Sequence, residues 1–91
     1  MKNWRGVAFE TQHTLQGEEF WEGSAGGVTF TVEPCHHGTH DATCTVLGIE
    51  YNSDGCFPKP EQALDDALGR AIETLADALI GLRLVKKGIQ Q

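Results

Sequence analysis

The chain has 91 residues, of which 40% are hydrophobic, and a formal net charge of -6. A chain of this length forms one domain, residues 1–91, with a single modest core, and its apolar content is too high for a disordered protein. No apolar run reaches the ~18–20 residues that a membrane span needs. Because the segment MKNWRGVAFE also lacks the apolar core of a signal peptide, we expect a cytoplasmic protein that does not bind membranes.

Basic side chains are absent from more than half of the chain. The seven Lys and Arg residues lie at positions 2, 5, 59, 70, 83, 86 and 87, whereas residues 6–58 contain eight acids. An acidic surface repels phosphate, so we expect no direct contact with DNA or RNA. It attracts basic protein surfaces, which many nucleic-acid-binding complexes present. The alternative is that the acids only keep the protein in solution.

The first part of the chain, residues 5–58, is predicted to be rich in strands. Residues 5–15 alternate in a strand pattern, and the short aromatic segment 18–24 is either an edge strand or the start of a long hairpin. Residues 26–34 show the clearest period-two alternation and end at a proline. Residues 42–51 form the next predicted strand, in which Gly48 marks a bulge that shifts the phase.

The segment PCHHGTHDATC, residues 34–44, concentrates histidine and cysteine and has three interpretations. We favour a polar hairpin loop, in which Gly38 allows the turn and Asp41 caps it. Zinc binding by four ligands is an alternative, although the spacing matches no standard module. A Cys–His pair with catalytic activity is the third, and would use His40. The candidate metal ligands are Cys35, His37, His40 and Cys44. We expect no cofactor, and three free cysteine thiols.

The last part of the chain, about residues 60–87, is predicted to be one amphipathic helix that begins at Pro60. Gly81 offers an earlier end, but the basic residues that follow suit the negative end of a longer helix. The apolar stripe at helical spacing predicts that Leu68 and Leu75 belong to the core. This stripe consists of Leu64, Leu68, Ala71, Ile72, Leu75, Leu79 and Leu82.

These elements together predict an α+β domain, an antiparallel sheet of three or four strands packed on one C-terminal helix. One sheet face, or a sheet edge, would stay free to hold a partner, and Trp and Tyr are favoured there as anchors. A homodimer is compatible with this arrangement. The predicted partner-binding residues are Glu18, Glu19, Trp21, Glu22, Glu33, Glu50, Tyr51 and Asp54.

Two resemblances bear on function. The stretch from FTVEP (30–34) through TCTVLGI (43–49) to PEQALDDALGRAIETL (60–75) is similar to HicB antitoxins, which neutralise a small basic RNA-cleaving toxin. The short acidic chain of strands followed by an alanine-rich helix resembles phage anti-CRISPR inhibitors, which block basic nucleic-acid channels. The second resemblance implies a non-enzymatic inhibitor of a nucleic-acid-handling complex, and this is the function that we expect.

Overall fold

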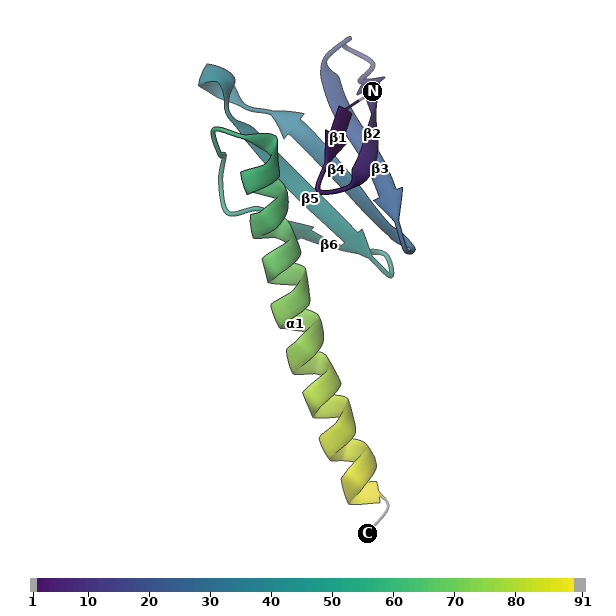
Figure 1. Cartoon of the computed structure of the whole chain (residues 1–91). Coiled ribbons are helices and arrows are strands. Elements are labelled where there is room, and N and C mark those ends of the chain that lie inside the picture. Colours follow the sequence, from purple (N-terminus) through teal and green to yellow (C-terminus); the bar gives the residue numbers. More distant parts are fainter. Residues whose placement is uncertain (1, 90–91) are drawn as a thin grey trace.

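The computed structural model describes residues 2–89, which form one antiparallel sheet and one long C-terminal helix (Figure 1). The α+β class is confirmed, but the sheet has six strands rather than three or four. The strands are β1 (Lys2–Trp4), β2 (Val7–His13), β3 (Glu19–Ala25), β4 (Val28–Pro34), β5 (His40–Val46) and β6 (Ile49–Asn52). A short 3-10 turn, η1 (His36–Gly38), joins β4 to β5, and the helix is α1 (Pro60–Ile89).

The strands form a meander in which each one pairs with its neighbours in sequence. Three connections have only two residues, both with positive φ: Arg5–Gly6, Gly26–Gly27 and Leu47–Gly48. This is the pattern of type I′ turns, whose twist suits a two-residue hairpin. The predicted bulge at Gly48 is therefore wrong. Leu47 (φ 52°) and Gly48 (φ 79°) instead turn the chain, so that the predicted strand 42–51 becomes two strands.

The core lies between one face of the sheet and the first turns of α1. Phe9 and Phe30 contribute from the sheet, with ring centroids 6.4 Å apart, and Val32 and Cys44 are almost fully buried beside them. The helix contributes mainly small residues, which let its backbone approach the sheet closely. These are Ala63, Ala67 and Ala71, together with Leu64.

The helix continues far beyond the sheet, as Figure 1 shows. It passes through Gly81 without a break, as predicted. The radius of gyration is 16.0 Å, whereas a compact chain of this size has about 12 Å. Leu68 packs against the core, but Leu75 is 37% exposed, so the prediction that it is a core residue is wrong. Within residues 2–89, no helix combines the length and apolar character that crossing a bilayer requires.

The cysteines also differ from expectation. Cys35 and Cys56 form a disulfide, and only Cys44 is a free thiol, buried in the core. The disulfide joins the β4–β5 connection to the loop that precedes α1. Beside it, His40 and Phe57 exchange two backbone hydrogen bonds of 2.7 Å. The prediction of three free thiols failed because residues 21 apart in sequence are brought together by this pairing.

Candidate functional site

The sheet face opposite the helix is the candidate site, and we call it the acidic face. Strand alternation places every second residue there, because the intervening residues, such as Phe9 and Phe30, point toward α1. Apart from Phe20 on β3, the other side chains on this face are small or polar, and no element within residues 2–89 covers them. Its acids are Glu10 on β2, Glu22 on β3, Glu33 on β4, Asp41 on β5 and Glu50 on β6.

Four of these acids lie in two cross-strand pairs. Glu10 is directly opposite Glu22, and Glu33 is directly opposite Asp41. Like charges at opposed positions of an antiparallel pair destabilise the sheet. Partial burial raises the pKa of Asp41, which shows that its charged form is poorly solvated. The acidic face therefore carries negative charges that lie close together across neighbouring strands.

No Lys or Arg side chain among residues 2–89 neutralises the acidic face. Lys2 lies on the helix side, with its ammonium 5.8 Å from the centre of the Trp21 ring. Arg5 forms a two-pronged ion pair with Asp65 of α1, which raises the pKa of Arg5. Arg70 binds Asp66 and Asp54. These three bases occupy other surfaces.

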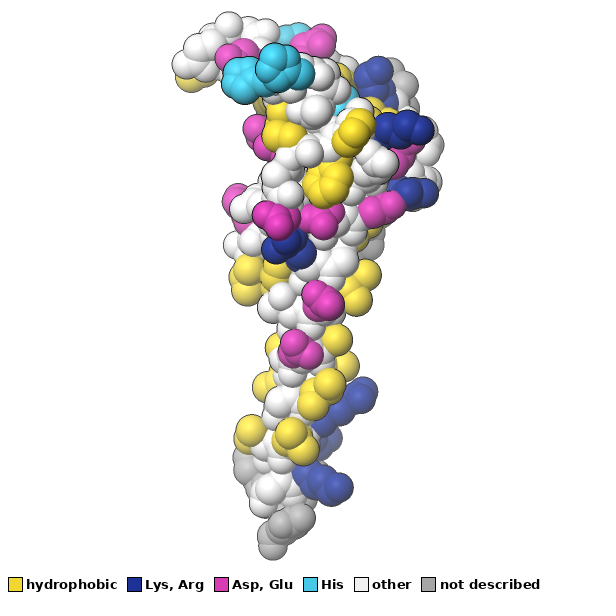
Figure 2. Space-filling model, turned by 90° about the vertical axis from the view of Figure 1, so that its left-hand side faces the viewer, with side chains coloured by type: hydrophobic (Ala, Val, Ile, Leu, Met, Phe, Trp, Pro, Cys, Tyr) yellow, Lys and Arg dark blue, Asp and Glu magenta, His cyan; other side chains and the backbone are white. Residues whose placement is uncertain are grey.

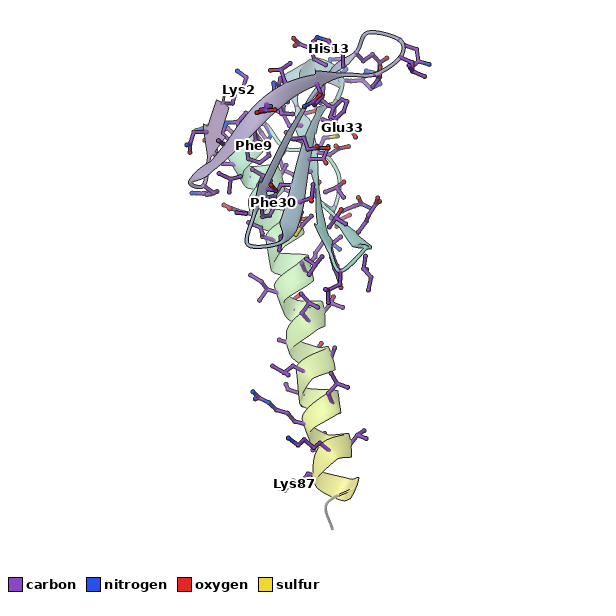
Figure 3. The ribbon with its side chains drawn as sticks, turned by 90° about the vertical axis from the view of Figure 1, so that its right-hand side faces the viewer. Lys2, Phe9, His13, Phe30, Glu33 and Lys87 are labelled. Atoms are coloured by element: carbon purple, nitrogen blue, oxygen red, sulfur yellow. A yellow bond between two sulfur atoms is a disulfide. The ribbon has the colours of Figure 1, made fainter. Side chains whose placement is uncertain are left out.

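Lys59 directly precedes the start of α1. The last three bases, Arg83, Lys86 and Lys87, lie near the other end of this helix. Figure 3 shows Glu33 within the sheet and Lys87 at the far end of α1. The molecule is therefore electrically polarised, with an acidic sheet and a basic helix end.

Two shallow hollows mark the acidic face. The first is lined by residues of β2, β3 and β4, including Glu10, Gln12 and Glu22. The second is lined by residues of β4, β5 and β6, including Glu33, Asp41 and Glu50. Each hollow thus contains one of the cross-strand acid pairs. Neither is a deep cleft, so the face suits an extended partner surface better than a small molecule.

The predicted partner-binding residues divide between several surfaces. Glu22, Glu33 and Glu50 lie on the acidic face. Glu18 directly precedes β3, and Glu19 is its first residue and approaches His13 at 3.7 Å. Asp54 lies beyond β6 and pairs with Arg70 over 3.2 Å.

The two predicted aromatic anchors lie on the helix side, packed against the core. Trp21 is partly buried and stacks edge-on against Trp4, with ring centroids 5.7 Å apart. Tyr51 is also partly buried against the core. Because strand alternation separates Trp21 from Glu22, neither aromatic residue shares a surface with the acidic face.

Sequence reasoning omitted Glu10 and Asp41 from the candidate site. The available signal was period two: Glu10 follows the apolar Phe9, and Asp41 precedes Ala42, so both belong to the opposite face. What the sequence did not reveal was the register. Only the observed pairing shows that each of these acids faces a second acid across the strands.

The cysteine and histidine segment forms a hairpin connection, as we favoured. The Cys35 amide donates to the Thr39 carbonyl over 2.7 Å, and the Thr39 hydroxyl donates to the His36 carbonyl over 2.7 Å. His37 takes a left-handed conformation with φ 60°. The prediction that Asp41 caps this loop is wrong, because Asp41 lies on β5 opposite Glu33.

The four proposed zinc ligands are not brought together in the described part of the chain. Cys35 is oxidised, Cys44 is in the core, His37 is exposed and His40 is partly buried beside the Trp21 ring. The one potential cluster within residues 2–89 is Cys35, Asp41 and Cys56, and its two sulfurs are bonded to each other. Burial raises the pKa of the Cys44 thiol, which disfavours the thiolate that catalysis or zinc binding requires.

Comparison with known proteins gave no match to a protein-family model, to a curated protein or to a solved structure. The resemblance to HicB antitoxins therefore rests on the segments quoted for it, and the resemblance to anti-CRISPR inhibitors rests on length, acidity and the order of elements.

Proposed function

We propose that the chain is a non-enzymatic protein-binding module that inhibits a nucleic-acid-handling complex by covering one of its basic surfaces. The observation that carries this proposal is two like-charge cross-strand pairs, Glu10 opposite Glu22 and Glu33 opposite Asp41, on a sheet face to which residues 2–89 contribute no Lys or Arg. Repulsion within each pair costs stability in the free protein. A cationic partner relieves that repulsion, so binding energy comes from charges that the fold alone leaves uncompensated.

The geometry of the acidic face agrees with this role. Its charges lie on five neighbouring strands, so they form a broad surface rather than a point, as occupation of an extended groove requires. Groups of one sign also steer association, which raises the rate at which an inhibitor reaches its target. Nucleic acid presents the same sign of charge, so the proposed mode of inhibition is direct competition for one basic surface.

The proposal places the protein in the cytoplasm, where such complexes act. The disulfide is the observation that opposes this setting, because the reducing cytosol keeps most thiols unpaired. Thiol labelling of the protein in intact cells separates the two cases. Labelling of Cys35 and Cys56 supports the cytoplasm, whereas full protection of both assigns the protein to an oxidising compartment.

The proposal is tested by capture of partners from a bacterial lysate at about 50 mM and about 300 mM salt, which bracket strong and weak screening. We expect nucleic-acid-binding proteins that are retained at low salt and released at high salt. The captured partner is then loaded with labelled duplex DNA, and addition of the acidic protein should displace the DNA from it. Recovery of a small basic ribonuclease in place of a larger complex would instead favour the HicB-like antitoxin.

A matched pair of variants tests the role of the acidic face. Glu22→Gln with Glu33→Gln should slow association by roughly tenfold or more at low salt, because electrostatic steering spans that range. The control, Glu19→Gln with Glu61→Gln, lies away from the acidic face, changes the net charge equally and should leave the rate almost unchanged. Equal effects of the two variants would show that only net charge matters, and the proposed site would then be rejected.

A further inference from the structure

The second half of α1 has no cover in the structure. Residues 72–89 extend about 27 Å beyond the part of the helix that meets the sheet. Figure 2 shows apolar side chains on this part of the helix, with basic side chains along one edge. The exposed fractions are 65% for Ile72, 37% for Leu75, 47% for Leu79, 57% for Ile80, 68% for Leu82, 65% for Leu84 and 62% for Val85.

A helix that is apolar around most of its circumference is normally buried. Gly81 and Gly88 lower its intrinsic stability. A second molecule that covers these apolar side chains would therefore stabilise this part of the helix.

The spacing of these residues indicates another helix as the cover. Ile72, Leu75, Leu79 and Leu82 follow the alternating three- and four-residue steps of a coiled-coil seam. The next position of the same seam is Lys86. A single lysine in a coiled-coil seam determines the register and the number of helices, because its charged end group is unfavourable beside another buried lysine.

The charges on α1 determine the orientation of that second helix. Acids precede the exposed segment and continue into it, at Glu73 and Asp77, whereas the bases lie together at its end, at Arg83, Lys86 and Lys87. In a parallel pair, the two Lys86 side chains would oppose each other within the seam. In an antiparallel pair, Lys86 lies against Leu75 of the other copy, at the level of its Glu73 and Asp77, and Leu79 meets Leu82.

We propose that residues 72–89 bind a second copy of this chain as an antiparallel helix pair. The charge pattern carries the choice of partner, because each helix supplies both the basic end and the acidic segment that complements it. The opposed helix dipoles favour the same orientation. The two sheets, with their acidic faces, then lie at opposite ends of the dimer, so the surface that joins the copies is separate from the proposed inhibitory face.

Sedimentation of the full chain in the micromolar range tests self-association. We expect a mass twice the 9.9 kDa of one chain. Leu82→Glu should raise the dissociation constant by roughly a hundredfold or more, because it buries carboxylates without a partner. Near-ultraviolet circular dichroism of the tryptophans should be unchanged, since the sheet core does not include Leu82. The control is Leu84→Glu, on the opposite side of the helix from the seam, which should leave the dimer intact.

A monomeric wild type would overturn the proposal, and so would equal loss of the dimer in Leu82→Glu and Leu84→Glu. Oxidative cross-linking then tests the orientation. A mixture of Leu75→Cys and Lys86→Cys chains should form a disulfide-linked pair of unlike chains, because these positions face each other in the antiparallel arrangement. Efficient cross-linking of Lys86→Cys chains with themselves would demonstrate a parallel pair and contradict the proposal.

Discussion

The two halves of α1 have apolar residues at the same spacing, yet their surroundings differ. In the first half, up to Ala71, the stripe meets β4, β5 and β6, and two ion-pair groups fix the polar side of the helix. In the second half, the same stripe continues into water. Helical periodicity in the sequence therefore predicts that an apolar face exists. It does not predict what covers that face, which depends on the rest of the fold or on a second molecule.

The largest expected effect on stability comes from truncating a leucine in the covered half of α1, compared with truncating one in the uncovered half. Leu64 is 2% exposed, so Leu64→Ala should lower the free energy of unfolding by about 2–5 kcal/mol. Leu84→Ala, in the uncovered half, should change it by less than about 0.5 kcal/mol. Chemical denaturation of both variants, monitored by tryptophan fluorescence, provides the measurement. Similar losses would mean that both halves are covered in the folded monomer.

Loss of the disulfide is expected to have the next largest effect on stability. The disulfide holds the loop that leads into the first, covered half of α1. Closure of a loop of this length stabilises a protein by about 3 kcal/mol in the chain-entropy treatment. Cys35→Ser with Cys56→Ser should therefore lose about that amount, and reduction of the wild type should produce the same midpoint of denaturation. Cys44→Ala is the control. This variant keeps the disulfide, so reductant should still lower its midpoint of denaturation.

The smallest expected effect is on the pH dependence of stability in the acidic range. The backbone amide of Asp54 donates to Asp66 over 2.7 Å and Arg70 donates over 3.0 Å, and together they lower the pKa of Asp66 in the folded state. A lowered pKa stabilises the fold above the unfolded value of about 4, and this contribution is lost as the pH falls through the folded value. Asp66→Asn should therefore make stability less dependent on pH in that acidic range.

Thermal melts between about pH 2 and pH 5 measure this difference around the unfolded carboxyl value. Asp77→Asn, in the uncovered half, is the matched control and should keep the acid sensitivity of the wild type at a protein concentration low enough to keep the chain monomeric. If the two substitutions flatten the profile equally, the polar anchoring of the first half does not contribute to stability.

Much of the fold follows from local patterns in the sequence. Phe30 and Val32 alternate with polar residues, and this alternation predicts β4. Pro60 and the leucine spacing predict α1. The split of residues 42–51 was missed because leucine rarely adopts the positive φ that Leu47 has here. The strand β1 has only three residues, too few for a periodic signal, and its stability depends on pairing with β2.

The candidate site was predicted only in part. Glu22, Glu33 and Glu50 were identified because of their charge, without knowledge of which face they occupy. Trp21 was predicted to be an anchor because Trp is favoured at binding surfaces. Adjacent strand residues point to opposite faces, however, and Trp21 packs on the core, away from Glu22. The pairing of Glu33 with Asp41 depends on the length of the β4–β5 connection, which composition alone does not define.

The order of the strands has a consequence for folding kinetics. Each strand pairs only with the strands adjacent to it in sequence, so most contacts within the sheet close short loops. Low contact order accelerates folding, and individual hairpins form within about 1–10 μs. The sheet can therefore assemble progressively from the three two-residue turns, with docking of Leu64 and its neighbouring alanines as the step that completes the core. With the disulfide intact, refolding should be a single exponential phase in the millisecond range or faster, of order the rates of mixed α and β domains.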